Sequence, residues 1–463
     1  MKYSNNNFPL IMSISCIAAM GSFLFGFDTG VINGTVGGLR LAFDSSLFVS
    51  SFNIASMLLG CGVGAFYSGW LSDRFGRRTM LIVAAVLFIV SAAGSGIADT
   101  SDVFIFYRLI GGLAVGSVSI LVPMYIAEIA PAHYRGAYGT LQQFGIILGF
   151  LVVYISNYLL VKFSGTSINE FWFGFETWRW MIWGELLPAV IFLITLFWIP
   201  ESPRYLVVKG KNKLALKVLI KLYGQFLGEA KLLDISMSLS SDHAPRLSDL
   251  KHRVTGKVHR VVWVGVFIAI FQQLIGINVI FYYGSVLWEL IGFSELNALF
   301  INIIVACVGG VGCLIMIFLV DIWGRRPLLK FGSVMIFLSL LTLAFIFMNV
   351  EKDVYGVINL GQYKVLTLIV VNLYVFIFNL SWGPVVWIML GEMFPNQIRG
   401  SALALAGLMH WIANFMIVMT FPLLLRSMGM VGVFSVYSGF TLIAGFFVFY
   451  YLSETKEKEL EDI

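Results

Sequence analysis

The sequence predicts an all-α membrane protein in which twelve transmembrane helices form two related six-helix bundles joined by a cytoplasmic helical linker. Three observations support this prediction: the apolar composition, the number and length of the apolar segments, and two motifs that recur in the same order in each half. Of the 463 residues, 59% are hydrophobic and 12% are charged, whereas an ordinary soluble domain has roughly 25% charged residues. A soluble fold could not bury that much apolar surface.

Twelve apolar segments are each long enough to cross a bilayer, since a spanning helix needs ~20 residues to cross a hydrocarbon core ~30 Å thick. The first segment follows a single lysine and lacks a small-residue cleavage site, so we expect a retained span and not a signal peptide. The predicted spans are 9–36, 48–70, 78–98, 103–127, 137–161, 178–199, 261–290, 296–320, 327–349, 362–391, 400–424 and 431–452.

The basic residues predict the orientation of these spans. Placing both termini in the cytoplasm puts most of the 30 Lys and Arg residues in cytoplasmic segments, as the positive-inside rule requires. We therefore expect a multi-pass protein of the plasma membrane or of a bacterial inner membrane, with both termini cytoplasmic. The expected domains are an N-terminal bundle at 1–199, a linker with short helices at 200–258, a C-terminal bundle at 259–452 and a cytoplasmic tail at 453–463.

Two charged motifs relate the halves. An aspartate followed by paired arginines stands after spans two and eight, and a glutamate with an arginine seven residues later stands after spans four and ten. This recurrence predicts a duplicated bundle with its substrate site between the halves, near the membrane midplane. The motif residues are Asp73, Arg77, Arg78, Glu128 and Arg135 in the first half and Asp321, Arg325, Arg326, Glu392 and Arg399 in the second.

We interpret these ten residues as a cytoplasmic gate network. Arginines at helix ends can form charge-assisted hydrogen bonds with carboxylates or with the C-terminal carbonyls of a neighbouring helix. Such a network would hold the two bundles together until the inner gate opens. The alternative is that these charges only set the topology, but orientation requires Lys or Arg and no acidic partners at matched positions.

The motifs, together with Pro200–Arg204 (PESPR) after span six and Gln272–Asn278 (QQLIGIN) in span seven, resemble the sugar porter family of the major facilitator superfamily. The likeness runs from span one to the tail and is greatest to the bacterial proton-coupled xylose symporters of that family. It implies the major facilitator fold and proton-coupled symport of a monosaccharide by alternating access, either a pentose such as xylose or a hexose such as glucose or galactose. Ser453 stands where the family's tail signature has proline.

Charged side chains inside spans are costly, about 2.5–3.5 kcal/mol for Asp or Arg at the centre, so each is a functional candidate. Asp28 lies in span one and Arg108 in span four. An aspartate that meets an arginine only at some stages can take up and release a proton, because burial favours its neutral form and the cation its charged form. The resemblance implies that this pair couples the proton; the alternative is a permanent ion pair that only joins helices.

Glu185 in span six is either a second acidic candidate or a member of the cytoplasmic gate network.

A sugar is uncharged, carries many hydroxyl groups and has apolar C–H faces. Its site should combine amides, which both donate and accept hydrogen bonds, with aromatic rings. An amide side chain could instead form a hydrogen bond between two helices, which would stabilise their packing by about 1 kcal/mol. Three amides within the seven residues 272–278 favour a binding site over this alternative. The resemblance implies sugar contacts for Gln143, Gln272, Gln273, Asn278 and Trp387, and aromatic wall or gate positions for Phe25 and Tyr282.

Helix geometry adds a condition for span seven. On a straight helix Gln273 and Asn278 point about 140° apart, too far to face one small ligand. Gly276 lies between them, and we expect the span to bend or unwind there so that both amides point inward.

Two positions depart from the xylose-type pattern. His410 stands where the symporters carry Gln, and Gly309 stands where they carry Asn. A histidine can still hydrogen-bond a hydroxyl group, and the glycine removes a donor and widens the site; the alternative for His410 is a packing or water-bound residue. These departures keep the sugar class and leave the particular sugar open.

The sequence also indicates what the protein does not do. The basic residues form no aromatic-interleaved face for nucleic acid, and the four cysteines show neither metal-type nor disulfide-type spacing. We expect no enzyme activity, no metal and no cofactor apart from the proton as coupling ion; the partners are the sugar and the lipid bilayer, and the functional unit is a monomer. The remaining alternatives are a proton-independent facilitator, a non-transporting sugar receptor, and a drug or metabolite antiporter.

Overall fold

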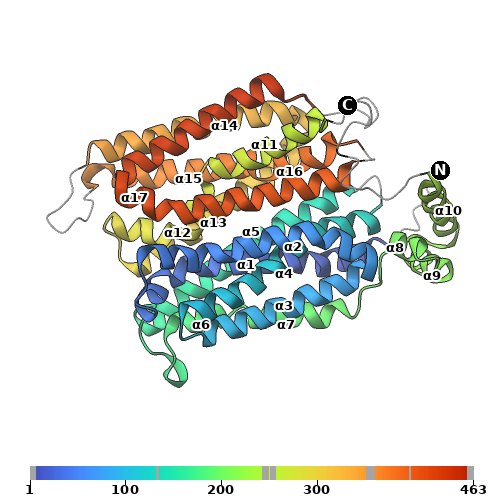
Figure 1. Ribbon diagram of the computed structural model, residues 1–463, viewed down its shortest axis with the longest axis horizontal. Coiled ribbons are helices and arrows are strands. Elements are labelled where there is room, and N and C mark those ends of the chain that lie inside the picture. The colour runs from blue at the N-terminus through green and yellow to red at the C-terminus, as the bar shows by residue number, and fades with distance from the viewer. Residues whose placement is uncertain are drawn as a thin grey trace.

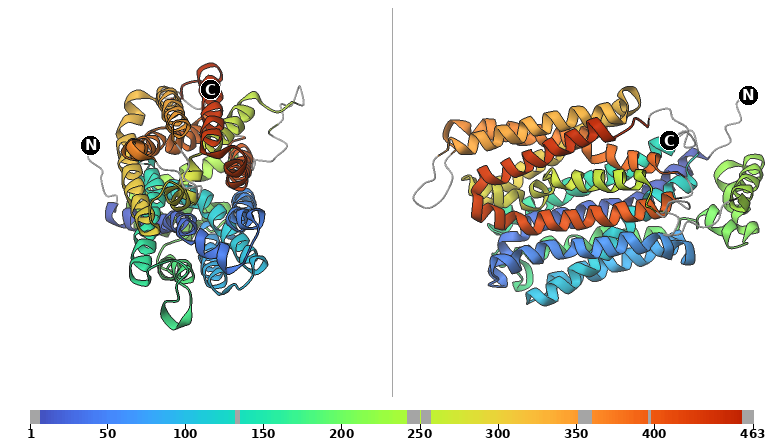
Figure 2. Two further views of the ribbon diagram at one scale, coloured as in Figure 1. Left: turned by 90° about the vertical axis from the view of Figure 1, so that its left-hand side faces the viewer. Right: turned by 45° about the horizontal axis from the view of Figure 1, so that its top comes forward.

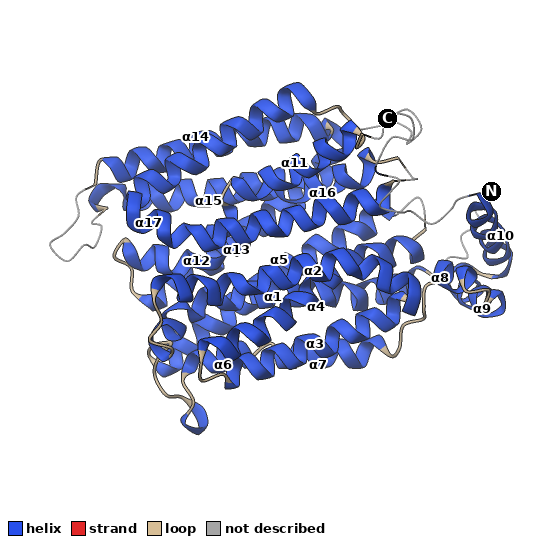
Figure 3. Ribbon diagram, in the orientation of Figure 1, coloured by secondary structure: helices blue, strands red, loops and turns tan. Residues whose placement is uncertain are grey.

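The structure is a computed structural model that describes residues 7–131, 135–241, 250, 257–350, 360–395 and 398–455. Within these ranges nearly all residues are helical, and none of them forms an extended strand (Figure 3). The predicted all-α class is therefore confirmed.

The described residues of the first half form seven α-helices and one short 3-10 helix (Trp172–Gly174). There are seven α-helices because the sixth predicted span is broken into two pieces at Gly184 and Glu185. Close packing holds this half together: a Cβ atom on Gly112 in the fourth helix would lie 2.0 Å from the Met57 carbonyl oxygen of the second, so only glycine permits this helix crossing. The helices are α1 (Phe8–Ala42), α2 (Leu47–Phe75), α3 (Arg77–Ile97), α4 (Ser101–Ile129), α5 (Arg135–Ser164), α6 (Thr177–Trp183) and α7 (Leu186–Leu196).

Three short helices occupy most of the predicted linker: α8 (Pro203–Val208), α9 (Asn212–Tyr223) and α10 (Gln225–Ser241). Helix α9 is amphipathic, since it buries Leu219 and Leu222 and exposes its lysines. The Asn7 backbone N–H at the start of α1 donates to the Leu222 carbonyl of α9 at 3.0 Å. The linker helices therefore lie at the end of the bundle where α1 begins (Figure 1).

The second half repeats the pattern of the first with different breaks. Span seven of the chain, the first span of this half, is divided at Gly276, and span ten is divided at Ser381. The helices are α11 (Arg260–Leu274), α12 (Ile277–Leu290), α13 (Glu295–Trp323), α14 (Arg325–Met348), α15 (Lys364–Leu380), α16 (Trp382–Met393) and α17 (Arg399–Tyr451).

Eleven helical stretches of the described residues are long and apolar enough to cross a membrane. The last of them, α17, has 53 residues, and its backbone leaves the helical conformation at Gly429 (φ 67°). A straight helix of that length would measure ~80 Å, more than twice the hydrocarbon thickness. Helix α17 thus accounts for two predicted spans, which gives the expected twelve. Several helices extend beyond the predicted bounds, since helical structure does not stop where the apolar run stops.

The two halves lie side by side with their helices nearly parallel, the first half from blue to green and the second from yellow to red (Figures 1 and 2). The seam between them is formed chiefly by α5 against α13, α2 against α17 and α1 against α12. Helices far apart in the sequence therefore form the walls of any site at the seam.

Candidate functional site

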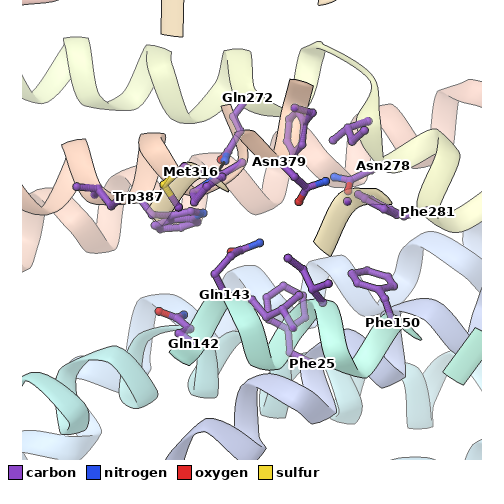
Figure 4. Close-up of a pocket in the computed structure, with 18 of the residues that line it drawn as sticks. Phe25, Gln142, Gln143, Phe150, Gln272, Asn278, Phe281, Met316, Asn379 and Trp387 are labelled. Atoms are coloured by element: carbon purple, nitrogen blue, oxygen red, sulfur yellow. Dashed lines mark hydrogen bonds between the residues drawn. The ribbon is translucent and has the colours of Figure 1, made fainter. Parts of the chain in front are cut away.

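The two halves enclose a cavity of about 640 Å³. Its wall combines α1, α4 and α5 of the first half with α11 to α17 of the second, and Figure 4 shows side chains from both halves pointing into it. All eight residues predicted to form the sugar site lie in this wall: Phe25, Gln143, Gln272, Gln273, Asn278, Tyr282, Trp387 and His410. Contact of these residues with a sugar stays a prediction.

The amides of span seven meet because the helix breaks where the sequence predicts. Helix α11 ends at Leu274, Gly276 adopts a left-handed conformation (φ 89°), and α12 begins at Ile277. The Asn278 amide then donates to the Gln273 side-chain oxygen and, at 2.9 Å, to Asn414 Oδ1. The expected bend is therefore confirmed, and it turns two amides toward the same cavity.

His410 lies in the cavity wall beside Gln273. The Gln273 amide nitrogen lies 3.1 Å and 3.2 Å from its two ring nitrogens, so the amide can donate to the unprotonated nitrogen of a neutral imidazole. The His410 ring also packs edge-on against Trp387 and Trp411, with ring centres 5.0 Å and 5.2 Å apart. These contacts fix the orientation of the imidazole in the cavity wall.

Gln272 makes a different use of its amide. Its nitrogen donates to the Trp382 and Gly383 carbonyls at 2.8 Å and 2.7 Å, in the first turn of α16, directly after the break in span ten. Its side-chain oxygen is buried without a hydrogen-bond partner. In this conformation Gln272 thus joins two broken helices, which is the alternative considered for such amides.

Three amide side chains of the cavity wall were not among the predicted site residues: Gln142, Asn379 and Asn414. A Cβ atom on Gly309 would lie 3.0 Å from the Asn379 amide nitrogen, so the space that the glycine leaves is faced by another amide. The signal for Asn379 was present in the sequence, as a polar residue in the otherwise apolar run 375–380.

Asp28 and Arg108 form an ion pair in the interior of the first half. Asp28 is 0% exposed and Arg108 1%, and an Arg108 guanidinium nitrogen contacts Asp28 Oδ1. The other carboxylate oxygen, Asp28 Oδ2, has no hydrogen-bond partner. A buried ion pair with an unsatisfied carboxylate oxygen is costly to keep.

Glu185 lies near this pair. It is buried at the break between α6 and α7, one of its carboxylate oxygens has no hydrogen-bond partner, and it interacts electrostatically with both Asp28 and Arg108. Of the two alternatives for Glu185, this position supports the second acidic candidate near Asp28 over a place in the cytoplasmic gate network. The physical reason is the break in span six, which directs the side chain into the first bundle.

A hydrogen-bonded cluster closes the seam at the end of the bundle opposite the linker. Asn33 of α1 donates to the Phe281 carbonyl at 2.8 Å and accepts from the Ser285 backbone N–H at 2.9 Å and from the Asn302 amide at 2.8 Å. Phe150 of α5 stacks on Phe281 with ring centres 4.9 Å apart. These contacts cross from the first half to the second, so they close the cavity on the side away from the linker.

Replacing Asn33 with alanine is expected to open the cavity on the side that the Asn33 contacts close. The change removes hydrogen bonds across the seam that are each worth about 1 kcal/mol, so the outward-facing form should gain at least about tenfold in population. A cysteine at Phe150 would then react correspondingly faster with an impermeant maleimide added from outside. Asn157→Ala is the matched control, since the Asn157 amide donates within the first half, to the Val31 carbonyl at 3.4 Å. Equal labelling rates in the two variants would contradict this role.

The charged motifs form matching clusters at the linker end of each half. In both, the first arginine of the pair joins an aspartate one turn earlier to the glutamate of a neighbouring helix. The distances are 2.8 Å for Arg77–Asp73, 3.1 Å for Arg77–Glu128, 3.0 Å for Arg325–Asp321 and 2.8 Å for Arg325–Glu392. The second arginines, Arg78 and Arg326, donate to the Phe197 and Phe449 carbonyls at 2.9 Å and 2.8 Å, near the ends of spans six and twelve.

Each of these ion pairs joins two residues of the same half. Arg399 donates to the Phe394 carbonyl at 3.2 Å in its own half, and the side chain of Arg135 lies outside the described residues. The expectation that the network joins the two bundles in another conformation therefore stays a prediction. In the present conformation the cavity extends to Asp321, Arg325 and Glu392, which means that it reaches the linker end of the second half.

Glu201 and Glu454 form a third pair of residues at matching positions in the two halves, which the sequence comparison of the halves did not identify. The Glu201 carboxylate accepts from the Arg77 and Arg78 backbone N–H groups at 2.9 Å and 3.1 Å, at the N-terminus of α3. Glu454 accepts from the same positions of α14, at 3.0 Å and 2.9 Å. Each carboxylate caps a helix start, where backbone donors lack partners and the dipole favours negative charge. The residue that follows each, Ser202 or Thr455, hydrogen-bonds the motif glutamate of its half.

Known proteins match this chain over nearly its whole length. The family described as sugar (and other) transporter matches residues 14–463. A glucose transport protein of Synechocystis is 43% identical, over 99% of this chain and 98% of its own. The D-xylose-proton symporter of Escherichia coli is 36% identical (99% and 96%), and the arabinose-proton symporter of Bacillus subtilis is 35% identical (99% and 95%).

Solved structures show the same fold. The xylose transporter XylE from E. coli in a partially occluded inward-open conformation superposes with a TM-score of 0.83 at 35% identity, covering 97% of this chain and 99% of that one. The proton:xylose symporter XylE bound to 6-bromo-6-deoxy-D-glucose gives a TM-score of 0.81 at 36% identity, with 98% of each chain covered.

Proposed function

The chain belongs to the sugar transporter family, and from this premise we propose that it carries a monosaccharide and a proton together across the cell membrane by alternating access. The observation that supports this most directly is the seam cavity, in which amides from both halves meet a histidine and two indole rings of the second half. Amides suit hydroxyl groups and indole faces suit the C–H faces of a sugar. A site shared by two rigid bundles can open to either side by rocking one bundle against the other.

Asp28, with Arg108 as its partner, is the proton carrier in this proposal. When the carboxylate is protonated, Arg108 loses its counter-charge, and the helices that the two residues join, α1 and α4, are free to shift. Because α1 also supplies Phe25 and Thr29 to the cavity wall, a change at Asp28 reaches the sugar site through a single helix. Glu185 is close enough to add or compensate charge at this position.

The conformation described corresponds to the inward-facing stage of the cycle. The cavity reaches the inner end of the second half, while the Asn33 cluster closes the outer side. Sugar and proton would leave toward the cytoplasm from this state. The linker and both termini lie on the cytoplasmic side of the plasma or bacterial inner membrane, and one chain holds a complete cavity, so the monomer is the functional unit.

Uptake by purified protein in liposomes tests the proposal. With an external pH below the internal pH, labelled glucose, galactose, xylose or arabinose should accumulate, and adding the sugar without a gradient should acidify the interior, as read by an entrapped pH dye. Equilibration without proton movement would identify a facilitator. Binding without uptake would identify a receptor, and export of a cationic drug in exchange for protons an antiporter.

Replacing His410 with alanine is expected to weaken sugar binding about tenfold, because it removes a hydrogen-bonding group and leaves the Gln273 amide without this partner, at about 1–1.5 kcal/mol. His410→Gln should restore most of the affinity, since glutamine also donates and accepts. Affinity is measured by the sugar-dependent thermal shift in detergent. Ser427→Ala, on the exposed part of α17, is the control. If alanine and glutamine at position 410 behave alike, the residue only packs.

A further inference from the structure

The connection between α5 and α6 is a short aromatic hairpin. Its tip, residues 171–175, reads Phe-Trp-Phe-Gly-Phe, without a charged residue. The Phe171 backbone N–H donates to the Phe175 carbonyl at 2.9 Å, and at the base the Thr177 N–H donates to the Asn169 carbonyl at 2.9 Å. These hydrogen bonds give the loop a defined shape.

The turn at the tip exposes a large ring at an unusual backbone position. Phe173 and Gly174 both have positive φ, 58° and 75°, as in a type I′ turn, where Asn-Gly is the preferred pair. A bulky residue rarely adopts this conformation. Phe173 does so and is 90% exposed, so its ring contributes little to packing within the chain.

The rings behind the tip continue the exposed apolar surface of span six. Trp172 contacts Trp180 of α6 with ring centres 5.6 Å apart, and Phe175 contacts Trp183 at 5.1 Å. Below Trp183 an exposed apolar stripe follows the span at helical spacing. It consists of Leu187, Val190, Ile191 and Ile194.

The direction of the hairpin indicates whether it contacts water or lipid. It lies between the end of α5 at Ser164 and the start of α6 at Thr177, at the end of the bundle opposite the linker. In the view along the bundle (Figure 2, left) the green hairpin extends sideways, beyond the outline of the helices. Since the helices run along the membrane normal, a sideways extension at this level points toward the outer lipid headgroups.

We propose that this aromatic hairpin, residues 171–175, inserts into the interfacial zone of the outer leaflet and anchors the outer end of span six. Tryptophan and phenylalanine rings suit this zone, which is apolar on one side and hydrated on the other. The charged residues flank the inserted rings: Glu176 at the base pairs with Arg179 at 2.6 Å. The hairpin thereby holds the first bundle at a fixed depth while the second bundle rocks against it.

Electron paramagnetic resonance of a spin label tests the proposal in liposomes. The label is attached to Phe173→Cys in a variant whose four native cysteines are replaced and whose transport is retained. Its collision rate with oxygen, relative to that with a water-soluble nickel chelate, should be at least about threefold higher than at Phe226→Cys. Phe226 is the matched control because it is 79% exposed on α10, at the cytoplasmic end. Equal ratios at the two positions overturn the proposal, as does dipolar broadening that shows a second copy of the chain at the hairpin.

A second measurement uses the unaltered chain. Hydroxyl-radical oxidation in lipid nanodiscs, read by mass spectrometry, should modify the peptide containing residues 171–175 several times less than the peptide containing Phe226, although both rings are exposed on the protein surface. Comparable oxidation of the two peptides overturns the proposal. Neither measurement depends on the identity of the transported sugar.

Discussion

The Asp28→Asn variant is expected to lose accumulation of sugar against a gradient while it retains exchange. Asparagine keeps the shape and a hydrogen-bonding oxygen opposite Arg108, but it cannot carry a proton. A proton coupled one to one with sugar supplies about tenfold accumulation for each unit of pH difference, equivalent to about 1.4 kcal/mol. The variant should therefore fall to an internal-to-external ratio of about one at any pH gradient, measured with labelled sugar in proteoliposomes.

Two controls separate coupling from damage at this site. Counterflow of labelled sugar against unlabelled sugar needs binding and rocking but no net proton movement, so it should persist in Asp28→Asn. Asp102→Asn removes an exposed carboxylate from α4, the helix that carries Arg108, and should accumulate sugar like the wild type. If Asp28→Asn still concentrates sugar, the proton does not travel on Asp28 and the pair only joins helices. If counterflow is lost as well, the pair is needed for folding or rocking.

The Gly276→Ala variant is expected to weaken sugar binding by at least about tenfold. Alanine disfavours the φ of 89° at this position by about 1 kcal/mol, and its Cβ would lie 2.7 Å from the Tyr437 ring. Both effects act on the bend between α11 and α12. If the bend straightens, Gln273 and Asn278 again point about 140° apart and no longer meet at the cavity.

The chain offers a matched control for this substitution. Gly429 also has a positive φ, 67°, yet a Cβ there meets nothing within 4 Å. Gly429→Ala therefore carries the backbone strain without the clash and lies away from the cavity wall. Sugar-dependent thermal shifts should change less than about twofold in apparent affinity for Gly429→Ala. If the two alanine variants bind alike, the bend at Gly276 does not determine the site.

Part of the candidate site could be read from the sequence because its signals are local. Asp28 and Arg108 stand out as charges within apolar spans, the amides of span seven cluster within seven residues, and Gly276 marks the bend that brings them together. The comparison of loops found both arginine motifs for the same reason. Each signal requires only the residue and its neighbours along the chain.

For other residues of the site the sequence could not identify the partner, because the partner depends on which helix faces which. Glu185 could be placed beside Asp28 only once the break in span six was seen. Asn33 and Asn302 are separated by 269 positions and meet across the seam. Asn379 could be related to Gly309 only from the packing of α15 on α13.

The sequence by itself determined the twelve spans, because the length of an apolar run is set by the bilayer thickness alone. It also determined their duplication and the residue types of the candidate site, because these signals lie in short motifs along the chain. The tertiary structure decided how these residues are used. It showed that Gln272 holds a broken helix, that the motif ion pairs lie within each half and that the seam is closed by Asn33. Inside a membrane the choice of partner for a polar side chain follows from helix packing, and twelve apolar helices of similar hydropathy can be packed in many ways until close contacts such as that at Gly112 select one.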